Sequence, residues 1–329
     1  MVSSEGMRVI IAGMGVQGPK RSRIAGKDVV AFVDPVMEDA DFRSVEDVPL
    51  DMYDTVLLCI PDQPKIGIIT YLLEQGKHVL VEKPLMAGKD EDLLMAQEMA
   101  RKQNLVCYTA YNHRFEPNLI GIRDAVQSGK LGDVYRIRMF YGNGTARDVR
   151  ESVWRDQGAG VLPDLGSHLL DILLFIFGEL PESVEWKVWS CQSFENRSPD
   201  HVVVATQPPG TKVMIELEMS LLSWRNHFAA EIYGSGGSMM MESLCKWGPS
   251  RLTYYERVLP SGRPPYESVT FEKPDPTWEA EYTHFKRLIQ QGEVGNTEND
   301  LLINRILREL SERALSQVET ENSKRGEGK

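Results

Sequence analysis

The fold of this chain is decided by the stretch RVIIAGMGVQG, which occupies residues 8–18. Arg8 to Ala12 is a short run that is apolar from Val9 onward, as is typical of a buried strand, and three glycines follow it in GxGxxG spacing. Between a strand and a helix, such glycines let backbone N–H groups approach a pyrophosphate. Asp34 follows 21 residues after Gly13, where a carboxylate can bind a ribose. The stretch predicts a dinucleotide-binding unit; a glycine-rich turn with Asp34 as a helix cap is the structural alternative.

The expected contacts with the dinucleotide come from this turn and from the carboxylate. They are Gly13, Met14, Gly15, Val16, Gln17, Asp34 and Pro35. A carboxylate at Asp34 repels the 2′-phosphate of NADP, and Pro35-Val36 bring no adjacent cation. NAD is therefore favoured over NADP. Arg21, Arg23 and Arg43 are the basic residues that limit this preference.

The composition is typical of an ordinary globular protein. The chain has 329 residues, 42% hydrophobic and 26% charged, and this length predicts two domains. A net charge of −11 argues against nucleic acid or an anionic membrane as a partner. No apolar run reaches the roughly 18 residues of a membrane helix, and residues 1–6 lack the features of a secretory signal, so we expect a cytoplasmic protein. The widely spaced cysteines argue against a zinc site and a disulfide framework.

Two kinds of pattern divide the chain. Up to residue 118, β-rich runs alternate with helical stretches, which predicts a doubly wound parallel sheet of the Rossmann type. Strands are expected at 8–12, 29–33, 55–60, 78–81 and 105–110, and helices at 66–75 and 89–102. Beyond it, strands are expected at 135–141, 184–193, 201–206, 212–222 and 228–233, and helices at 277–291 and 298–317.

We therefore expect an α/β chain with two domains. The first, 1–118, is a dinucleotide-binding Rossmann domain. The second, 119–318, is an α+β domain with a largely antiparallel sheet. Its last helix is expected to pack back on the first domain. The tail 319–329 is polar and is expected to be disordered.

Lys83 stands at the end of an expected interior strand, in the run HVLVEKPL at 78–85. In open α/β sheets, ligands bind in the crevice beyond the carboxyl ends of the strands. A lysine delivered there is placed to meet a ligand. The alternative is a surface lysine in a loop, which is the commoner environment for lysine.

A second chemical cluster lies in the run GAGVLPDLGSHLLD at 158–171. Asp164, His168 and Asp171 fall at i, i+4 and i+7 of an apolar helix, which puts them on one face. A carboxylate one turn from a histidine can orient the ring for proton transfer near neutral pH. The alternative is a core histidine satisfied by Asp164. Metal binding is not expected, because no third ligand stands at a recognisable spacing.

Taken in order, these motifs resemble the Gfo/Idh/MocA oxidoreductase family, whose members include inositol dehydrogenase and glucose-fructose oxidoreductase. The matches are the glycine turn, EKP at 82–84, YNHRF at 111–115, WR at 154–155, and residues 160–168 with Asp171. The resemblance implies that Lys83, Asp164 and His168 form the catalytic group. It also implies a cis bond before Pro84. It further implies that the second domain, 119–318, binds substrate and that the free face of its largely antiparallel open sheet mediates dimer or tetramer contacts.

The resemblance extends the set of expected contacts. Additional cofactor contacts are expected at Ile60, Pro61, Glu82, Lys83, Asn112 and Arg155. Substrate contacts are expected at Tyr141, Asn143, Trp154 and Arg225, with Arg147 and the neighbours of Arg225 as further candidates. One position departs from the family pattern: Lys65 stands where many members carry a histidine after the third strand. Any cofactor contact at that position is therefore in doubt.

The mechanism expected from these residues is hydride transfer between a carbinol carbon of a sugar, inositol or nucleotide-sugar and C4 of nicotinamide. His168 would exchange the hydroxyl proton, Lys83 would stabilise negative charge on the oxygen, and Asp164 would orient His168. Alternatives are a keto-sugar reductase that uses the same residues in reverse, an enzyme that retains and cycles its cofactor, and a non-catalytic dinucleotide-binding regulator.

Overall fold

The computed structural model describes residues 6–152, 155–178, 180 and 184–326. The chain forms two compact units. The first comprises Met1–Asn112 and Pro276–Asn304, and the second His113–Asp275 and Arg305–Lys329. The first border therefore lies at residue 112 and not at the predicted 118, and residues 276–304, predicted as part of the second domain, belong to the first unit. The chain returns to the first unit because Tyr282 and Phe285 pack into the apolar core beneath its sheet.

The first unit is built on a five-stranded parallel sheet in the order β2-β1-β3-β4-β5. The strands are β1 (Val9–Ala12), β2 (Val29–Val33), β3 (Thr55–Leu58), β4 (His78–Glu82) and β5 (Cys107–Ala110). The three central strands β1, β3 and β4 are apolar almost throughout because helices cover both faces of the sheet. The prediction of a doubly wound parallel sheet is confirmed.

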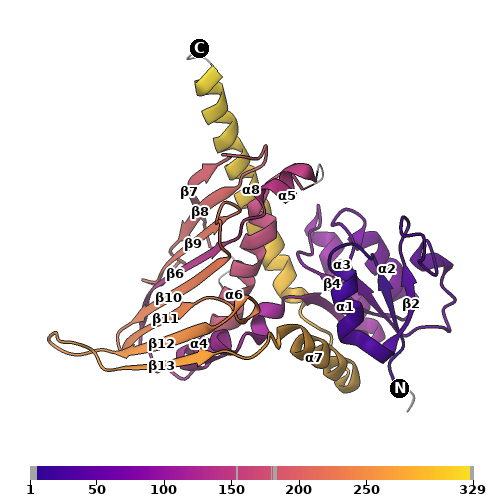
Figure 1. Cartoon of the computed structure of the whole chain (residues 1–329), viewed down its shortest axis with the longest axis horizontal. Coiled ribbons are helices and arrows are strands. Elements are labelled where there is room, and N and C mark those ends of the chain that lie inside the picture. The colour runs from indigo at the N-terminus through magenta and orange to yellow at the C-terminus, as the bar shows by residue number, and fades with distance from the viewer. Residues whose placement is uncertain (1–5, 153–154, 179, 181–183, 327–329) are drawn as a thin grey trace. The chain divides into compact units, whose positions relative to one another are not determined.

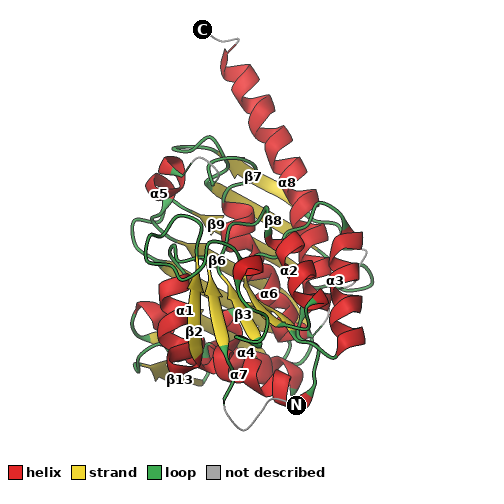
Figure 2. Cartoon of the chain, turned by 90° about the vertical axis from the view of Figure 1, so that its right-hand side faces the viewer, coloured by secondary structure: helices red, strands yellow, loops and turns green. Residues whose placement is uncertain are grey.

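Helices lie on both faces of this sheet, as Figure 2 shows for α1 on one side and α2 and α3 on the other. They are α1 (Gly18–Ala25), α2 (Lys65–Glu74), α3 (Asp90–Gln103) and α7 (Thr277–Gln291), with the short turns η1 (Gly26–Asp28) and η2 (Val45–Asp47). Helix α3 carries three acidic residues in its first turn and two basic residues in its last, which complements the helix dipole. It ends at Asn104 in the left-handed conformation that terminates many helices.

The second unit is built on an eight-stranded, mostly antiparallel sheet in the order β13-β12-β11-β10-β6-β9-β8-β7, fanned out in Figure 1. Among the described strands of this second sheet, only β6 and β9 pair in parallel. The strands are β6 (Val134–Gly142), β7 (Lys187–Gln192), β8 (His201–Thr206), β9 (Met214–Ser220), β10 (His227–Gly234), β11 (Gly237–Glu242), β12 (Ser250–Glu256) and β13 (Tyr266–Phe271). The predicted fold class is confirmed.

One face of this sheet is covered by helices. These are α4 (Pro117–Gln127) and α6 (Ser167–Phe177), preceded by η3 (Asn112–Phe115) and the π-helical turn η4 (Leu162–Gly166) respectively. The short helices α5 (Ala146–Glu151) and η5 (Cys245–Trp247) belong to the same unit. Side chains alternate along β6: Ile137, Met139 and Tyr141 are buried, whereas Arg136 and Arg138 lie on the other, open face. The strand therefore presents one apolar face and one charged face.

The last helix, α8 (Thr297–Gly326), is longer than predicted. Disorder was expected from residue 319, but the helix continues to Gly326, so that prediction is wrong for residues 319–326. Apolar residues anchor the preceding part, since Ile303, Leu307, Leu310 and Ala314 are buried, and an established helix extends at little further cost. None of the described helices combines the length and the apolar character that crossing a membrane requires.

Candidate active site

The glycine turn after β1 combines two tight backbone contacts with one open position. A Cβ atom on Gly13, whose φ is +91°, would lie 2.4 Å from the carbonyl oxygen of Cys59. A Cβ on Gly18 would lie 2.1 Å from the carbonyl oxygen of Gly13. At Gly15 a Cβ would meet nothing within 4 Å. Two glycines thus permit the turn, and the third leaves open the space that a bound pyrophosphate needs. The turn fits a dinucleotide.

The carboxylate of Asp34 closes this turn from the end of β2. Its Oδ2 accepts a hydrogen bond from the Met14 amide at 2.7 Å, and its Oδ1 accepts from the Val36 and Met37 amides at 2.8 and 2.9 Å. Desolvation raises the pKa of Asp34, but the hydrogen bonds from these N–H groups have the larger effect and lower it below its usual value. The group is therefore a fixed anion. Arg43 donates to the backbone carbonyls of Asp34, Met37 and Glu38, in the loop that follows β2.

The glutamate of the EKP motif is held by a buried arginine. Arg21 on α1 is 2% exposed, and its Nε and Nη1 each lie 2.6 Å from a carboxylate oxygen, of Glu82 and Glu281 respectively. Burial lowers the pKa of Arg21, but the two carboxylates outweigh it and raise that pKa. The guanidinium also lies 4.4 Å from the centre of the Trp278 ring. Arg21 is therefore neither a solvated surface charge nor a group open to a phosphate.

Lys83 follows directly after β4, at the carboxyl end of the strand. Its peptide bond to Pro84 is cis, as the family resemblance implied. Lys65, the residue at the family's histidine position, lies beside this segment and is 1% exposed. Its ammonium donates to the carbonyl oxygens of Glu82 and Pro84 at 2.6 and 2.8 Å. Lys65 thus contacts the backbone on both sides of Lys83.

The remaining first-unit residues expected at the cofactor lie on the same sheet or on its carboxyl side. Ile60 follows β3 and packs partly against the core, and Pro61 is exposed. Val16 is 76% exposed in the glycine turn. Asn112 is buried, and its amide donates to the Thr277 hydroxyl at 2.8 Å. The Asn112 side chain therefore supports the fold of the first unit.

In the second unit, His168 lies in a cluster of aromatic and basic side chains. The imidazole, in the first turn of α6, is 6% exposed. It stacks on His113 with ring centres 4.1 Å apart and planes 10° from parallel. His113 Nε2 lies 3.2 Å from the Tyr141 hydroxyl, which accepts a hydrogen bond from Lys246 at 2.7 Å. The Tyr141 hydroxyl therefore links His113 to Lys246.

The two aspartates that flank His168 in sequence have different arginine partners. Asp164 lies in the π-helical turn η4 and accepts from Arg155 at 3.2 Å. Asp171 is 1% exposed and is bound by the Arg114 guanidinium through contacts of 2.6 to 2.9 Å. Burial raises the pKa of Asp171, and Arg114 opposes that shift. Asp171 therefore forms a buried ion pair with Arg114, a partner that the helical spacing alone did not predict.

Asp164 remains electrostatically linked to the His168 cluster. Burial raises the pKa of the Tyr141 hydroxyl, and the nearby negative charge of Asp164 raises it further. Tyr141 therefore stays protonated at neutral pH and acts as a hydrogen-bonding group. Sequence reasoning missed His113 and Lys246 as members of this cluster. The YNHRF motif contained a signal for His113, whereas nothing in the local sequence around Lys246 pointed to it.

The expected substrate residues have different surroundings. Tyr141 belongs to the His168 cluster. Asn143 accepts hydrogen bonds from the backbone and hydroxyl of Thr145, at 3.2 and 2.7 Å. Arg225 is exposed and, within the described part of the chain, has no hydrogen bond or ion pair. Trp154 lies outside the described residues.

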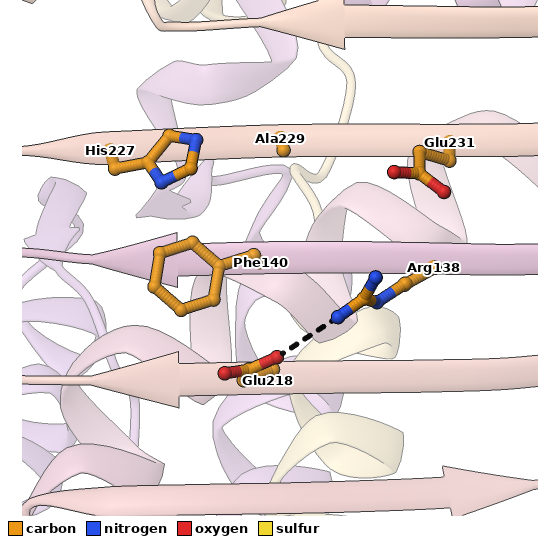
Figure 3. A pocket seen from close by; sticks show the side chains of 6 residues that line it. All are labelled: Arg138, Phe140, Glu218, His227, Ala229 and Glu231. Atoms are coloured by element: carbon orange, nitrogen blue, oxygen red, sulfur yellow. Dashed lines mark hydrogen bonds and ion pairs between the residues drawn. The ribbon is translucent and has the colours of Figure 1, made fainter.

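His227, a neighbour of Arg225 in sequence, lies on the open face of the sheet. It lines a hollow of about 260 Å³ together with Arg138, Phe140, Glu218, Ala229 and Glu231 (Figure 3). Its ring centre is 5.0 Å from that of Phe140, whereas the next residue, Phe228, packs against Tyr141 on the opposite face. His227 is therefore separated by the sheet from the His168 cluster.

Two family models match consecutive parts of the chain. One, described as an oxidoreductase family with an NAD-binding Rossmann fold, matches residues 7–111, and the other, the GFO/IDH/MocA C-terminal domain, matches residues 120–240. The chain belongs to the GFO/IDH/MocA oxidoreductase family. The resemblance found from the motifs is thereby confirmed.

Individual relatives agree with this assignment. Inositol 2-dehydrogenase from Corynebacterium glutamicum is 24% identical over 235 residues, covering 66% of this chain and 68% of the relative. An uncharacterized oxidoreductase from Schizosaccharomyces pombe is 30% identical over 142 residues; the match covers 42% of this chain and spans only 37% of that relative's length. A structure of levoglucosan dehydrogenase with NADH and levoglucosan superposes with a TM-score of 0.79 at 18% identity, covering 95% of this chain and 98% of the other. At this identity, the superposition supports the fold alone.

Proposed function

We propose that this protein is an NAD-dependent oxidoreductase acting on a secondary hydroxyl or ketone of a sugar, inositol or nucleotide-sugar. The observation that carries the proposal is the position of Lys83 at the carboxyl end of β4, in the sheet whose β1 ends in the open glycine turn. Ligands of such sheets bind at this edge. The relatives named as inositol and levoglucosan dehydrogenases support a polyhydroxylated substrate.

The cofactor would be held by groups whose chemistry matches its parts. The amides of the turn 13–17 and the N-terminus of α1 would bind the pyrophosphate, and Asp34 would accept hydrogen bonds from the ribose hydroxyls. Bound NAD supplies the hydride acceptor at C4 of nicotinamide. The preference for NAD over NADP is supported by the fixed negative charge of Asp34. Arg21 does not offset that charge, because Glu82 and Glu281 bind it.

In the proposed reaction, Lys83 and His168 act on the same substrate oxygen. The Lys83 ammonium donates a hydrogen bond to the oxygen and stabilises negative charge that develops on it. His168 removes the hydroxyl proton during oxidation and returns it during reduction. Asp164 favours the protonated imidazole through its negative charge. Because these roles are reversible, the same residues serve a dehydrogenase and a keto-sugar reductase.

We further propose that the protein assembles as a homodimer or homotetramer through the open face of the eight-stranded sheet. The proposal is supported by alternation along β6, which places Arg136, Arg138 and Phe140 on a face that no helix of the second unit covers in Figure 1. Light scattering coupled to gel filtration would test it. A mass of two or four chains that falls to one chain in Phe140→Glu supports this interface, and a monomer at micromolar concentration refutes it.

The experiment that tests the proposed activity is a substrate panel followed by nicotinamide absorbance. Sugars, inositols and nucleotide-sugars are offered with NAD, and the matching ketones with NADH. We expect turnover with at least one class, and a Lys83→Met variant that binds NADH normally but turns over at least about 100-fold more slowly. Full activity of a folded Lys83→Met variant would overturn the proposal. NADH binding without turnover of any compound in the panel would favour the alternative of a non-catalytic dinucleotide-binding regulator.

A further inference from the structure

Lys65 uses its whole ammonium group to hold the chain on both sides of Lys83. It is the first residue of α2, and it donates to the carboxylate of Asp62 at 2.7 Å and to the carbonyls of Glu82 and Pro84 at 2.6 and 2.8 Å. We propose that Lys65 is a positioning residue that fixes the backbone of Lys83, and hence the direction of its side chain. This inference rests on the proposed catalytic role of Lys83.

The geometry explains why the two carbonyls matter. The carbonyls of Glu82 and Pro84 belong to the residues immediately before and after Lys83. When both are tied to one buried atom, the Glu82–Lys83 peptide is held on one side of Lys83 and the Pro84–Leu85 peptide on the other. The short segment between them then has little freedom to rotate, and the Cα–Cβ bond of Lys83 keeps one direction. A catalytic group must be held this closely, because a displacement of about 1 Å can cost on the order of 100-fold in rate.

The chemistry of the ammonium explains why a lysine suits this position. An ammonium has three N–H donors and no acceptor, and here three oxygens receive them. A neutral imidazole offers a single N–H donor, so a histidine at this position could hold one of these oxygens but not all three. The departure of Lys65 from the family pattern is therefore a gain of backbone support for the Lys83 segment.

Burial makes this support costly to remove. Desolvation lowers the pKa of Lys65, while the charges of Asp62 and Glu82 oppose that shift. The side chain of Glu82 is in turn held by Arg21. The segment before Lys83 is thus fixed through both its backbone and its side chain, whereas the Lys83 side chain itself remains partly exposed. Removing the Lys65 ammonium would leave two carbonyl oxygens without their donor in a buried place.

Lys77 provides a matched control within the same sheet. Its ammonium also donates to two backbone carbonyls, those of Leu50 and Tyr53, at 2.6 and 2.8 Å. It precedes β4, at the amino end of the strand, whereas Lys83 follows the carboxyl end. Substitution of Lys77 by methionine therefore removes the same kind of contact at the edge of the sheet where no ligand is expected.

The test compares Lys65→Met and Lys77→Met in the full-length protein. We expect both to lose stability, but only Lys65→Met to lower kcat, by about tenfold or more, with the KM for NAD changed less than about threefold. In a Lys83→Met background, Lys65→Met should lower kcat no further, because its effect passes through Lys83. If Lys65→Met does not fold, Lys65→Gln, which retains an amide donor, takes its place throughout.

Hydrogen exchange supplies a readout that does not depend on activity. Amide exchange in a peptide covering residues 79–87 of the cofactor-free protein should be faster in Lys65→Met and unchanged in Lys77→Met. The inference is overturned by unchanged exchange and kcat in Lys65→Met, by an equal kcat loss in Lys77→Met, or by a further loss in the Lys83→Met background. Full activity of Lys83→Met itself would refute the proposed function, and the exchange result would still show whether Lys65 holds the segment.

Discussion

Replacement of Arg21 by methionine should severely destabilise the first unit, because it leaves two carboxylates in a buried place without their cation. Arg21 and Glu281 are 2% and 0% exposed, and Glu82 is 7% exposed. Methionine resembles the aliphatic part of arginine in length, so the substitution removes the charge and the hydrogen bonds with little change in packing. The cost therefore reports mainly on the two stranded carboxylates.

The expected magnitude follows from the burial of the pairs. Breaking a buried ion pair by removing one partner costs about 3–5 kcal/mol. The Arg8–Asp54 pair of the same unit, whose side chains are 45% and 32% exposed, provides the contrast, since an exposed pair contributes about 0–1 kcal/mol. Arg21→Met should thus lower the free energy of unfolding by roughly 2–5 kcal/mol more than Arg8→Met does.

Urea unfolding followed by far-UV circular dichroism measures this difference. A triple variant, Arg21→Met with Glu82→Gln and Glu281→Gln, should recover part of the loss, because neutral amides replace the stranded charges. The reasoning is refuted if Arg21→Met lowers the free energy of unfolding no more than Arg8→Met, or if the triple variant is less stable than Arg21→Met alone.

Three further predictions concern the cofactor turn and the pH dependence of stability. Gly15→Ala should fold normally but weaken NADH binding about tenfold or more, whereas Gly13→Ala should lose stability because its Cβ would collide with backbone at positive φ. Asp34→Ala should weaken NADH binding about tenfold and raise the affinity for NADPH relative to NADH, because the repulsive charge is gone. Burial lowers the pKa of His78 to about 4, so the unfolded chain takes up a proton that the folded one does not as the pH falls from 6.5. Wild type should thus lose roughly 3 kcal/mol more than His78→Asn between pH 6.5 and 4.

Fluorescence titration with NADH and NADPH and urea titrations at several pH values check these expectations. Equal effects of Gly13→Ala and Gly15→Ala on both folding and binding would contradict the division of roles in the turn. An Asp34→Ala variant with unchanged cofactor preference would remove the argument for NAD. Parallel pH profiles of wild type and His78→Asn would show that this imidazole does not control the acid sensitivity.

Most strands and helices of the first unit could be predicted from local sequence patterns. The apolar run before Gly13 and the carboxylate at Asp34 lie within one short segment of the sequence. Their spacing corresponds to a turn, a helix and a second strand, so it could be recognised without knowledge of distant contacts. The long strands β6 and β10 were also found, because their apolar residues alternate. In contrast, β11, β12 and β13 were not predicted. Strand β13 is exposed along most of its length and therefore carries little apolar alternation to detect.

The partners of charged residues could not be predicted, because they depend on contacts distant in sequence. Arg21 was expected only as a basic residue near the cofactor that limits the preference for NAD, yet it is bound by Glu281, which stands 260 residues away. Lys65 looked like a lost cofactor contact, yet its acceptors include backbone carbonyls that no sequence pattern marks. Helical spacing grouped Asp171 with His168, but in the folded protein Asp171 forms an ion pair with Arg114.

The most direct test of the proposed function is a double-mutant comparison of Lys83→Met and His168→Asn on the substrate found in the panel. Each single variant should lower kcat/KM by on the order of 10²–10⁴-fold while NADH binding stays within about threefold of wild type. The double variant should be little worse than the poorer single variant, because in the proposed reaction both residues would act on one oxygen. Losses that multiply in the double variant, or wild-type activity in either single variant, would contradict the account.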